Sequence, residues 1–332
     1  MALNLKLKEL AGQIRNSYGE GSCQLLGEDV VRSQTKERMP SGIRSLDVAL
    51  NGGWVRGAMH ELYGNEGEGK TTIALHTIAE AQRRGHCVAF IDAEHSLNKE
   101  YAQKLGVDTD NLLVAQPDYG EQGVEVACEL CNSGIIDLLV IDSVTALVPK
   151  AEIDGDMTDA CMGAHARLMS KMCRVITPSI SRNGVVLILI NQVRMKIGVF
   201  FGSPETTTGG KGIKFYSGMR IRIGSSQVKN GGTVDESKRL VKAVFKKHKW
   251  GKMYAESEML LNLGEGIDLG QDALWYGLHR GIITLSGSFY KMDNIKLGNG
   301  RQKAGQTLLE HIDEYERLLH EQNDQTSKST GN

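Results

Sequence analysis

Residues 59–72 read MHELYGNEGEGKTT, which is an apolar segment, a glycine-rich turn and the start of a helical pattern. The apolar segment Met59–Tyr63 is typical of a buried strand, and Thr71–Arg84 has the periodicity of a helix. Between them lies GxxxxGKT, whose glycines let successive backbone N–H groups curl around phosphate oxygens. Because the strand, the turn and the helix occur in the order that this motif requires, the sequence predicts a P-loop that binds a nucleoside triphosphate.

Two side chains of this P-loop have predicted chemical roles. Lys70 is expected to reach the β- and γ-phosphates of ATP, and the Thr71 hydroxyl is expected to hold Mg²⁺. The helix N-terminus adds partial positive charge beside the phosphates. The residues predicted to contact the nucleotide here are Gly64, Asn65, Glu66, Gly67, Glu68, Gly69, Lys70, Thr71 and Thr72.

Three further apolar segments end in polar side chains that suit the same site. Asp142 is expected to bind Mg²⁺ through water, although a carboxylate at such a place can also cap a helix. Glu94 is assigned to polarising the attacking water, the alternative being a surface carboxylate. Gln192 is an amide that can donate to a γ-phosphate oxygen and so report the third phosphate. The preceding segments are Leu138–Ile141, Cys87–Ile91 and Val185–Ile190.

The alternation of these strands with helical patterns such as Gly163–Arg182 sets the fold class. Continuous apolar strands joined by helical crossovers predict an α/β fold with a mainly parallel sheet covered on both faces. Three later segments are expected to add antiparallel strands at one edge. They are Met219–Ile223, Leu240–Phe245 and Glu256–Leu263.

The chain divides into four predicted regions. Residues 1–38 form an amphipathic helix and a linker, residues 39–267 the ATPase core, residues 268–322 a small α+β domain and residues 323–332 a disordered polar tail. One helix cannot bury its own apolar stripe, so the stripe is expected to dock on the neighbouring domain or on another copy of the protein. The stripe consists of Leu3, Leu7, Leu10 and Ile14.

The composition limits the classes of function. The longest apolar run is far shorter than the ~20 residues that span a bilayer, so we expect no membrane partner and a cytoplasmic protein. The formal net charge of −1 leaves DNA binding open only if basic groups are clustered locally. Cys128 and Cys131 form a CxxC pair without a second pair to complete a zinc site, so both are expected to be inert thiols packed on the buried face of a helix.

Two irregular segments and one basic cluster are candidates for binding DNA. The segment Arg194–Gly210 mixes cations with apolar groups, which suits phosphates and base stacking, although a merely flexible connection is the alternative. The segment Asp154–Gly163 is acidic, and its residues alone leave its role undecided. The cluster Lys238–Lys252 is either a solvated face or a set of lysines that reach a phosphate bound by a neighbouring subunit.

Taken together, these segments resemble the RecA-type recombinases of bacteria and phages along nearly the whole chain. A P-loop is shared by many NTPases, whereas NQVRMKIG at residues 191–198 followed by PETTTGG at residues 204–210 is far more specific. The resemblance implies a RecA-like core with an N-terminal polymerisation arm and a small C-terminal α+β domain. It also implies an ATPase that forms helical homopolymers on single-stranded DNA and exchanges strands with homologous double-stranded DNA during repair. Repressors and filament-loading proteins are further partners that it suggests.

The resemblance also assigns roles to individual residues. Glu94 corresponds to the catalytic carboxylate and Gln192 to the link between the γ-phosphate and DNA. Tyr101 corresponds to a residue that stacks on adenine, beside Asn98, where relatives often carry Asp. Lys247 and Lys249 correspond to a pair that crosses to the neighbour's ATP, with Lys246 and His248 as the other possible alignment, and Phe215 to an interface residue. The DNA-binding set implied is Met162, Arg167, Arg174, Arg194, Met195, Lys196, Ile197, Gly198, Thr208, Gly209, Gly210 and Lys211.

Two rival functions are compatible with a P-loop core. A hexameric helicase or translocase shares the ATPase fold, but it forms closed rings instead of open filaments. A regulatory scaffold that holds ATP only as a structural ligand would release no phosphate. The specific residue blocks favour the recombinase.

Overall fold

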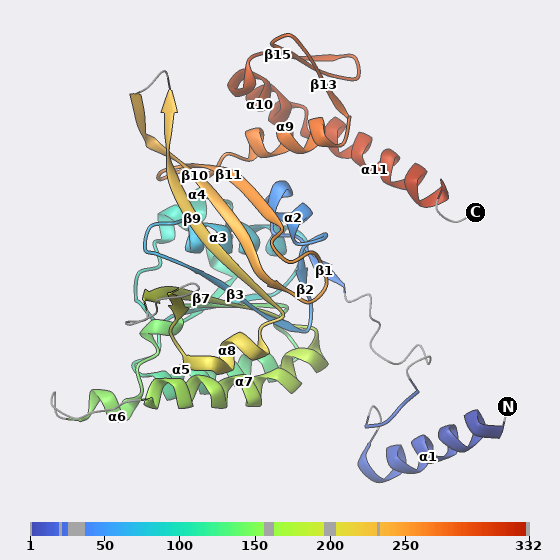
Figure 1. Cartoon of the computed structure of the whole chain (residues 1–332), viewed down its shortest axis with the longest axis vertical. Helices are drawn as coiled ribbons and strands as arrows, with labels where there is room; N and C mark the ends of the chain where they lie inside the picture. Colours follow the sequence, from blue (N-terminus) through green and yellow to red (C-terminus); the bar gives the residue numbers. More distant parts are fainter. Residues whose placement is uncertain are drawn as a thin grey trace. The chain divides into compact units, whose positions relative to one another are not determined.

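The computed structural model describes residues 2–19, 22–25, 37–155, 163–195, 204–230 and 233–329 (Figure 1). The chain divides into two compact units, Met1–Arg38 and Met39–Asn332. The first unit holds helix α1 (Ala2–Tyr18), on which the side chains of Leu5, Leu7 and Leu10 are exposed. Two members of the predicted apolar stripe, Leu7 and Leu10, are therefore among the exposed side chains of this helix.

The second unit is built around a sheet in which the described residues form ten strands. The strand order is β12-β11-β10-β9-β3-β7-β6-β4-β5, and β8 pairs with β7 off this path. The run from β9 to β5 is parallel, as the sequence predicts for most of the sheet. The strands are β3 (Ala58–Gly64), β4 (Val88–Asp92), β5 (Leu112–Ala115), β6 (Leu138–Asp142), β7 (Val186–Met195), β8 (Glu205–Thr207), β9 (Met219–Asn230), β10 (Thr233–His248), β11 (Glu256–Asn262) and β12 (Gly266–Ile267).

Strand β9 corrects one expectation. The sequence predicts Met219–Ile223 as an antiparallel addition, but β9 pairs in parallel with β3, with Tyr63 opposite Arg222. The reason is the connection: α8 (Gly210–Tyr216) carries the chain back along the sheet before β9 begins, and a helical return gives a parallel neighbour. In this sheet, β10 and β11 are antiparallel to both of their neighbours, β12 is antiparallel to β11, and β8 is antiparallel to β7.

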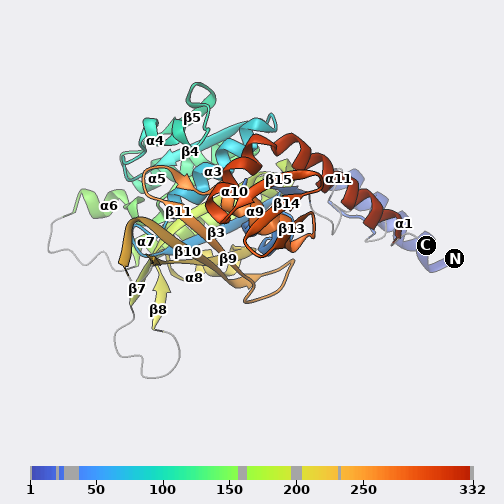
Figure 2. The same ribbon diagram turned by 90° about the horizontal axis from the view of Figure 1, so that it is seen from above.

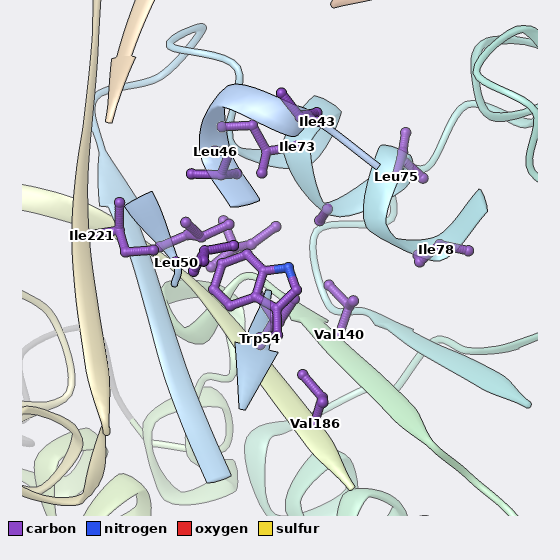
Figure 3. Close-up of a cluster of buried hydrophobic side chains, with 14 of the residues drawn as sticks. Ile43, Leu46, Leu50, Trp54, Ile73, Leu75, Ile78, Val140, Val186 and Ile221 are labelled. Atoms are coloured by element: carbon purple, nitrogen blue, oxygen red, sulfur yellow. The ribbon is translucent and has the colours of Figure 1, made fainter. Parts of the chain in front are cut away.

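Helices cover both faces of this sheet and create two separate cores. Successive residues of β7 point to opposite faces, so Ile188 belongs to one core and Leu189 to the other. The first core surrounds Trp54, which is fully buried (Figure 3). Its indole N–H donates to Thr77 Oγ1 at 3.2 Å. Helices α2 (Arg44–Ala49) and α3 (Lys70–Arg83) pack on this face, and α5 (Gly120–Asn132), α7 (Ala164–Asn183) and α8 on the other.

Cysteines of α5 lie in the second core. Cys131 is buried and Cys128 is half-buried, which confirms that the CxxC pair packs inside the protein. Burial raises the pKa of the Cys131 thiol to about 12, with a smaller contribution from Cys128. Short elements complete this part of the chain. They are β1 (Arg38–Met39), β2 (Trp54–Val55), α4 (Lys99–Lys104) and α6 (Lys150–Ile153).

The C-terminal region has a third core of its own, built around Met292, Leu308 and Tyr315. Its helix α11 continues to Ser329, although the sequence predicts an irregular tail from residue 323. No Pro or Gly interrupts residues 312–329, so nothing local ends the helix earlier. In the part of the chain that the structure describes, no helix is both long and apolar enough to cross a membrane. The remaining elements are α9 (Leu269–His279), β13 (Ile283–Ser286), β14 (Phe289–Met292), β15 (Ile295–Asn299), α10 (Arg301–Glu310) and α11 (Ile312–Ser329).

Candidate nucleotide and DNA site

The predicted P-loop joins the end of β3 to the start of α3. Gly67 and Gly69 have φ angles of 71° and 87°, a left-handed conformation that glycine adopts without strain. Gly64 lies so close to Ile223 O and to the Glu68 carboxylate that an added Cβ would collide with both. The glycines are therefore required by the turn and by the close approach of β9.

Lys70 occupies the centre of this loop. Its side chain is buried and its ammonium donates to Asn65 O at 2.6 Å. Burial lowers the pKa of Lys70, while the carboxylates of Asp142, Glu68 and Glu94 act in the opposite direction. The ammonium is thus held inside the phosphate-binding loop, where a polyphosphate would compete for it.

Thr71 and Asp142 meet across the edge of the sheet. The Thr71 hydroxyl donates to Asp142 Oδ2 at 2.6 Å, because α3 starts directly above the end of β6. The pKa of Asp142 is raised to about 6, mainly by burial and also by the carboxylates of Glu94 and Asp92, against the opposing effects of Thr71 and Lys70. Two oxygen donors this close fit Mg²⁺, which prefers oxygen ligands and takes the rest from phosphates and water.

The carboxylates at the end of β4 and just after it have different surroundings. Asp92 is buried and accepts the N–H groups of Ser96 and Leu97 at 3.0 and 3.2 Å, so it fixes the turn. Glu94 is exposed, and Ser143 Oγ donates to its Oε1 at 2.5 Å. The sequence alone did not single out Ser143, which follows Asp142 and positions Glu94 beside it.

Tyr101 and Asn98 lie next to the P-loop. The Tyr101 hydroxyl is 2.9 Å from Thr72 Oγ1, and Asn98 Oδ1 accepts the Tyr101 N–H at 2.8 Å. Tyr101 also lines a cavity of about 210 Å³ together with P-loop residues. The same cavity is lined by residues from the end of β11 that the sequence analysis did not identify, Leu261, Leu263 and Gly264.

Gln192 lies directly beside the P-loop. Strands β3 and β7 are in register so that Gly64 is opposite Gln192. The preceding Asn191 is buried, and its amide donates to Glu61 Oε1 and to Thr208 O, both at 2.9 Å. Asn191, which was not predicted as a site residue, therefore ties the far end of the Arg194–Gly210 segment to the central strands.

The base of the Arg194–Gly210 segment is a short antiparallel ladder. Arg194 pairs with Thr206 and Met195 with Glu205, and Figure 2 shows β7 and β8 side by side. Arg194, Met195 and Lys211 are exposed, whereas Gly209 is buried at the start of α8. Four predicted DNA-binding residues lie outside the described residues, namely Met162, Lys196, Ile197 and Gly198.

The predicted basic residues of α7 are brought together. Arg167 and Arg174 line one cavity of about 630 Å³, and Lys171 lies between them on the same helix. Positions 167, 171 and 174 share one helix face. Lys171 could have been found in the sequence from this spacing.

Two predicted interface residues are also neighbours. The Lys247 ammonium donates to Lys214 O at 2.8 Å and to Phe215 O at 2.9 Å, and the Phe215 side chain is 71% exposed. Lys249 is exposed. His248, from the alternative pair, is instead buried and stacks on Phe245 within its own protomer, with ring centroids 5.2 Å apart.

Comparison with known proteins identifies the family. Residues 5–268 match the RecA N-terminal domain and residues 272–322 match the RecA C-terminal domain. The chain is 46% identical over 327 residues to Protein RecA of Gluconacetobacter polyoxogenes, covering 96% of this chain and 92% of that protein. It is 49% identical over 311 residues to Protein RecA of Mycobacteroides abscessus, covering 93% and 89%. Similarity over this length means that the chain belongs to the RecA family.

Proposed function

We propose that the protein is an ATP-dependent recombinase that polymerises on single-stranded DNA and exchanges strands with homologous double-stranded DNA. Membership of the RecA family favours this function over a hexameric helicase or translocase. The observation that carries the proposal is the register of β3 and β7, which places Gln192 beside the first residue of the P-loop. The segment predicted to bind DNA begins two residues later.

The catalytic part of the proposal concerns hydrolysis of ATP. The P-loop amides and Lys70 bind the phosphates, and Mg²⁺ held at Thr71 and Asp142 supplies charge neutralisation when bound. Glu94 accepts a proton from the attacking water, and Ser143 holds the carboxylate toward the site through its 2.5 Å hydrogen bond. Tyr101 and Asn98 contact the adenine of the bound ATP.

The second part is coupling between ATP and DNA. Gln192 contacts the γ-phosphate, and the same strand continues into Arg194 and Met195 at the base of the DNA-binding segment. If ATP favours the conformation that binds DNA, DNA must tighten ATP binding by the same factor. Hydrolysis then removes the contact and releases the DNA.

The third part is assembly. Lys247 and Lys249 reach the ATP of the neighbouring subunit, so Lys247 exchanges its two carbonyl partners on α8 for phosphate oxygens. Phe215, exposed on α8, packs in the same interface, and the exposed leucines of α1 dock on another copy. The nucleotide-binding site is then complete only at the interface between two protomers.

The fourth part is recognition of DNA. Arg167 and Arg174, with Arg194 and Lys211, neutralise backbone phosphates, and Met162 and Ile197 separate bases. Contacts to the backbone position a strand without reading its sequence, so homology is read by base pairing between strands. Repressors and filament-loading proteins are further partners of such a filament, which would act in the cytoplasm.

A strand-exchange assay tests this function. Purified protein is incubated with circular single-stranded DNA and either a homologous or a heterologous linear duplex, with ATP or ADP. We expect joint molecules only with ATP and the homologous duplex. Electron microscopy of the same mixtures should reveal open helical filaments; closed rings and directional unwinding would favour the helicase.

A further inference from the structure

One guanidinium connects the P-loop to the base of the DNA-binding segment. Arg222 Nη1 donates to Glu68 Oε2 at 2.7 Å, and its Nη2 donates to Glu205 Oε1 at 3.1 Å. A second bond to Glu205 runs from Nε to Oε2 at 3.2 Å. Glu68 belongs to the P-loop, and Glu205 is the first residue of β8. The two carboxylates are far apart in sequence, and Arg222 joins them.

The strand order of the sheet places Arg222 at this position. Strand β9 pairs in parallel with β3 and brings Arg222 opposite Tyr63, next to the start of the P-loop. An added Cβ on Gly64 would overlap the Glu68 carboxylate and approach Arg222 Nη1, so the glycine leaves room for the pair. The arrangement therefore depends on the close approach of β9 that the glycine allows.

Glu68 also bonds within the P-loop. Its Oε2 accepts the backbone N–H of Asn65 at 2.6 Å, and its Oε1 accepts the Asn65 side-chain amide at 3.1 Å. The carboxylate thus holds the shape of the loop that surrounds the phosphates. Any anion that enters this loop meets the negative charge of Glu68 and competes for the same donors.

Glu205 plays the corresponding part at the other end. It is opposite Met195 in the β7–β8 ladder, at the last pair before the segment 196–204. A carboxylate held by bonds from both Nε and Nη2 of Arg222 fixes the start of β8. The interaction between Arg222 and Glu205 therefore helps to set the position of the C-terminal end of the DNA-binding segment.

Burial makes the cluster sensitive to added charge. The side chains of Arg222, Glu68 and Glu205 are 16%, 13% and 34% exposed. Ion pairs shielded from water are screened less than surface pairs, so a nearby polyphosphate changes their balance more strongly. One cation between two carboxylates cannot satisfy both equally once the surroundings of one of them become more negative.

We propose that Arg222 is a positioning residue that transmits the presence of polyphosphate from Glu68 in the P-loop to Glu205 at the base of the DNA-binding segment. The inference rests on the proposed function, since it supplies a second route for the coupling of ATP to DNA beside Gln192. Phosphates compete with both carboxylates for the guanidinium and draw it toward the P-loop, so its bonds to Glu205 weaken. The base of the segment is then held less firmly when nucleotide is bound and can adopt the conformation that binds DNA.

The test measures coupling instead of catalysis. The dissociation constant for a fluorescent single-stranded oligonucleotide is determined by anisotropy with and without a slowly hydrolysed ATP analogue. The variants are Arg222→Gln, Arg222→Lys, Glu68→Gln, Glu205→Gln and the double variant Glu68→Gln/Glu205→Gln. Arg317→Gln is the matched control, because Arg317 is also shared by two carboxylates, Glu314 and Glu321, but lies exposed on α11.

We expect Arg222→Gln to reduce the enhancement of DNA affinity by the ATP analogue about 2- to 30-fold. Arg222→Lys should recover only part of it, since one ammonium does not replace a forked guanidinium. Glu68→Gln and Glu205→Gln should each reduce the enhancement, and the double variant should be no worse than the more severe single variant. Arg317→Gln should behave as the wild type.

Three results would overturn the inference. The first is an unchanged enhancement in Arg222→Gln, and the second is strictly additive effects of the two glutamate substitutions. The third is a wild type whose DNA affinity is not enhanced by the ATP analogue. That result would refute the proposed coupling as well, whereas the first two results would refute only the role of Arg222. If Arg222→Gln does not fold, as judged by thermal unfolding, the two single glutamate variants and their double variant decide the question.

Discussion

Helices α3 and α2 both begin at places that attract negative charge, but they obtain it differently. At α2, Asp272 of the C-terminal region accepts the N–H groups of Arg44 and Ser45 at 2.6 and 3.0 Å. At α3, the first residues instead line a cavity of about 210 Å³ and are preceded by a glycine-rich loop. A helix N-terminus stabilises anions, so the chain supplies one itself at α2, whereas we propose that a bound ligand supplies it at α3.

The contact at the start of α2 is structural, whereas the start of α3 is a candidate binding site. The carboxylate of Asp272 is buried, and Arg44 packs over the Tyr315 ring at 5.1 Å, so the C-terminal region is fixed to the core. Around α3 the acidic side chains hold neighbouring groups instead of the helix amides. Asp142 accepts from Thr71, and Glu94 accepts from Ser143. These groups surround the phosphate position without filling it.

Removal of Glu94 should give the largest effect. The variant Glu94→Gln keeps the size of the side chain but cannot accept a proton, so DNA-stimulated phosphate release should fall about 10²–10⁴-fold. Binding of a fluorescent ATP analogue should persist. Glu100→Gln, an exposed carboxylate in the first turn of α4, is the control and should retain activity. Hydrolysis at the wild-type rate in Glu94→Gln would exclude the assigned role.

Truncation of Gln192 should separate binding from coupling at the same edge. Gln192→Ala should still bind ATP, because the P-loop is intact, but ATP should no longer tighten single-stranded DNA. A typical coupling of about 5- to 150-fold would then approach unity. Anisotropy titrations with and without the ATP analogue measure it, and Gln103→Ala on α4 serves as control. An unchanged enhancement would reject the link through Gln192.

Loss of Asp272 should affect stability and leave the nucleotide site unchanged. Asp272→Ala leaves two N–H groups of α2, one buried and one partly buried, without their acceptor, so the free energy of unfolding should fall by about 3 kcal/mol. Urea denaturation measures the change, and the affinity for ATP should stay within twofold. Asp313→Ala, at an exposed carboxylate, should cost less than about 1 kcal/mol. A large loss of ATP affinity in Asp272→Ala would contradict the separation of the two helix starts.

The sequence predicts the groups that local order brings together. Lys70 and Thr71 follow β3 after the short P-loop, and Asp142 is the last residue of β6. A strand–loop–helix motif and one strand end therefore suffice to predict their positions. Glu94 follows the same logic at the end of β4. The mainly parallel sheet could also be predicted, because its strands are continuously apolar.

Groups that depend on the order of distant strands could not be predicted. Leu261 reaches the nucleotide cavity only because β11 pairs with β10, and Arg222 reaches Glu68 only because β9 is parallel to β3. The sequence shows Asn191 only as the residue before Gln192. Its side-chain amide, however, donates hydrogen bonds to both Glu61 and Thr208. Each of these contacts is fixed by register between segments that no local pattern relates.

The smallest expected effect is a pH dependence of the free energy of unfolding, which comes from His76 near the middle of α3. His76 is buried, and its Nε2 accepts the backbone N–H of Ile267 at 3.0 Å, which requires the neutral ring. Burial lowers the pKa of His76 from 6.5 to about 4. Between these values the unfolded chain binds more protons, so the contribution of His76 is present above pH 6.5 and is lost as the pH falls toward 4.

The loss through His76 should be on the order of 2 kcal/mol of unfolding free energy. Asp47 opposes it, because burial raises its pKa to about 7 and its contribution therefore increases as the pH falls. We therefore compare Asp47→Asn with Asp47→Asn/His76→Gln by urea denaturation from pH 7 to pH 4. As the pH falls, the single variant should lose stability relative to the double variant, since Gln does not titrate and the raised pKa values of Asp142 and Asp272 act equally in both. Parallel pH profiles would mean that His76 is protonated without cost, and that β12 does not depend on a neutral ring to hold α3.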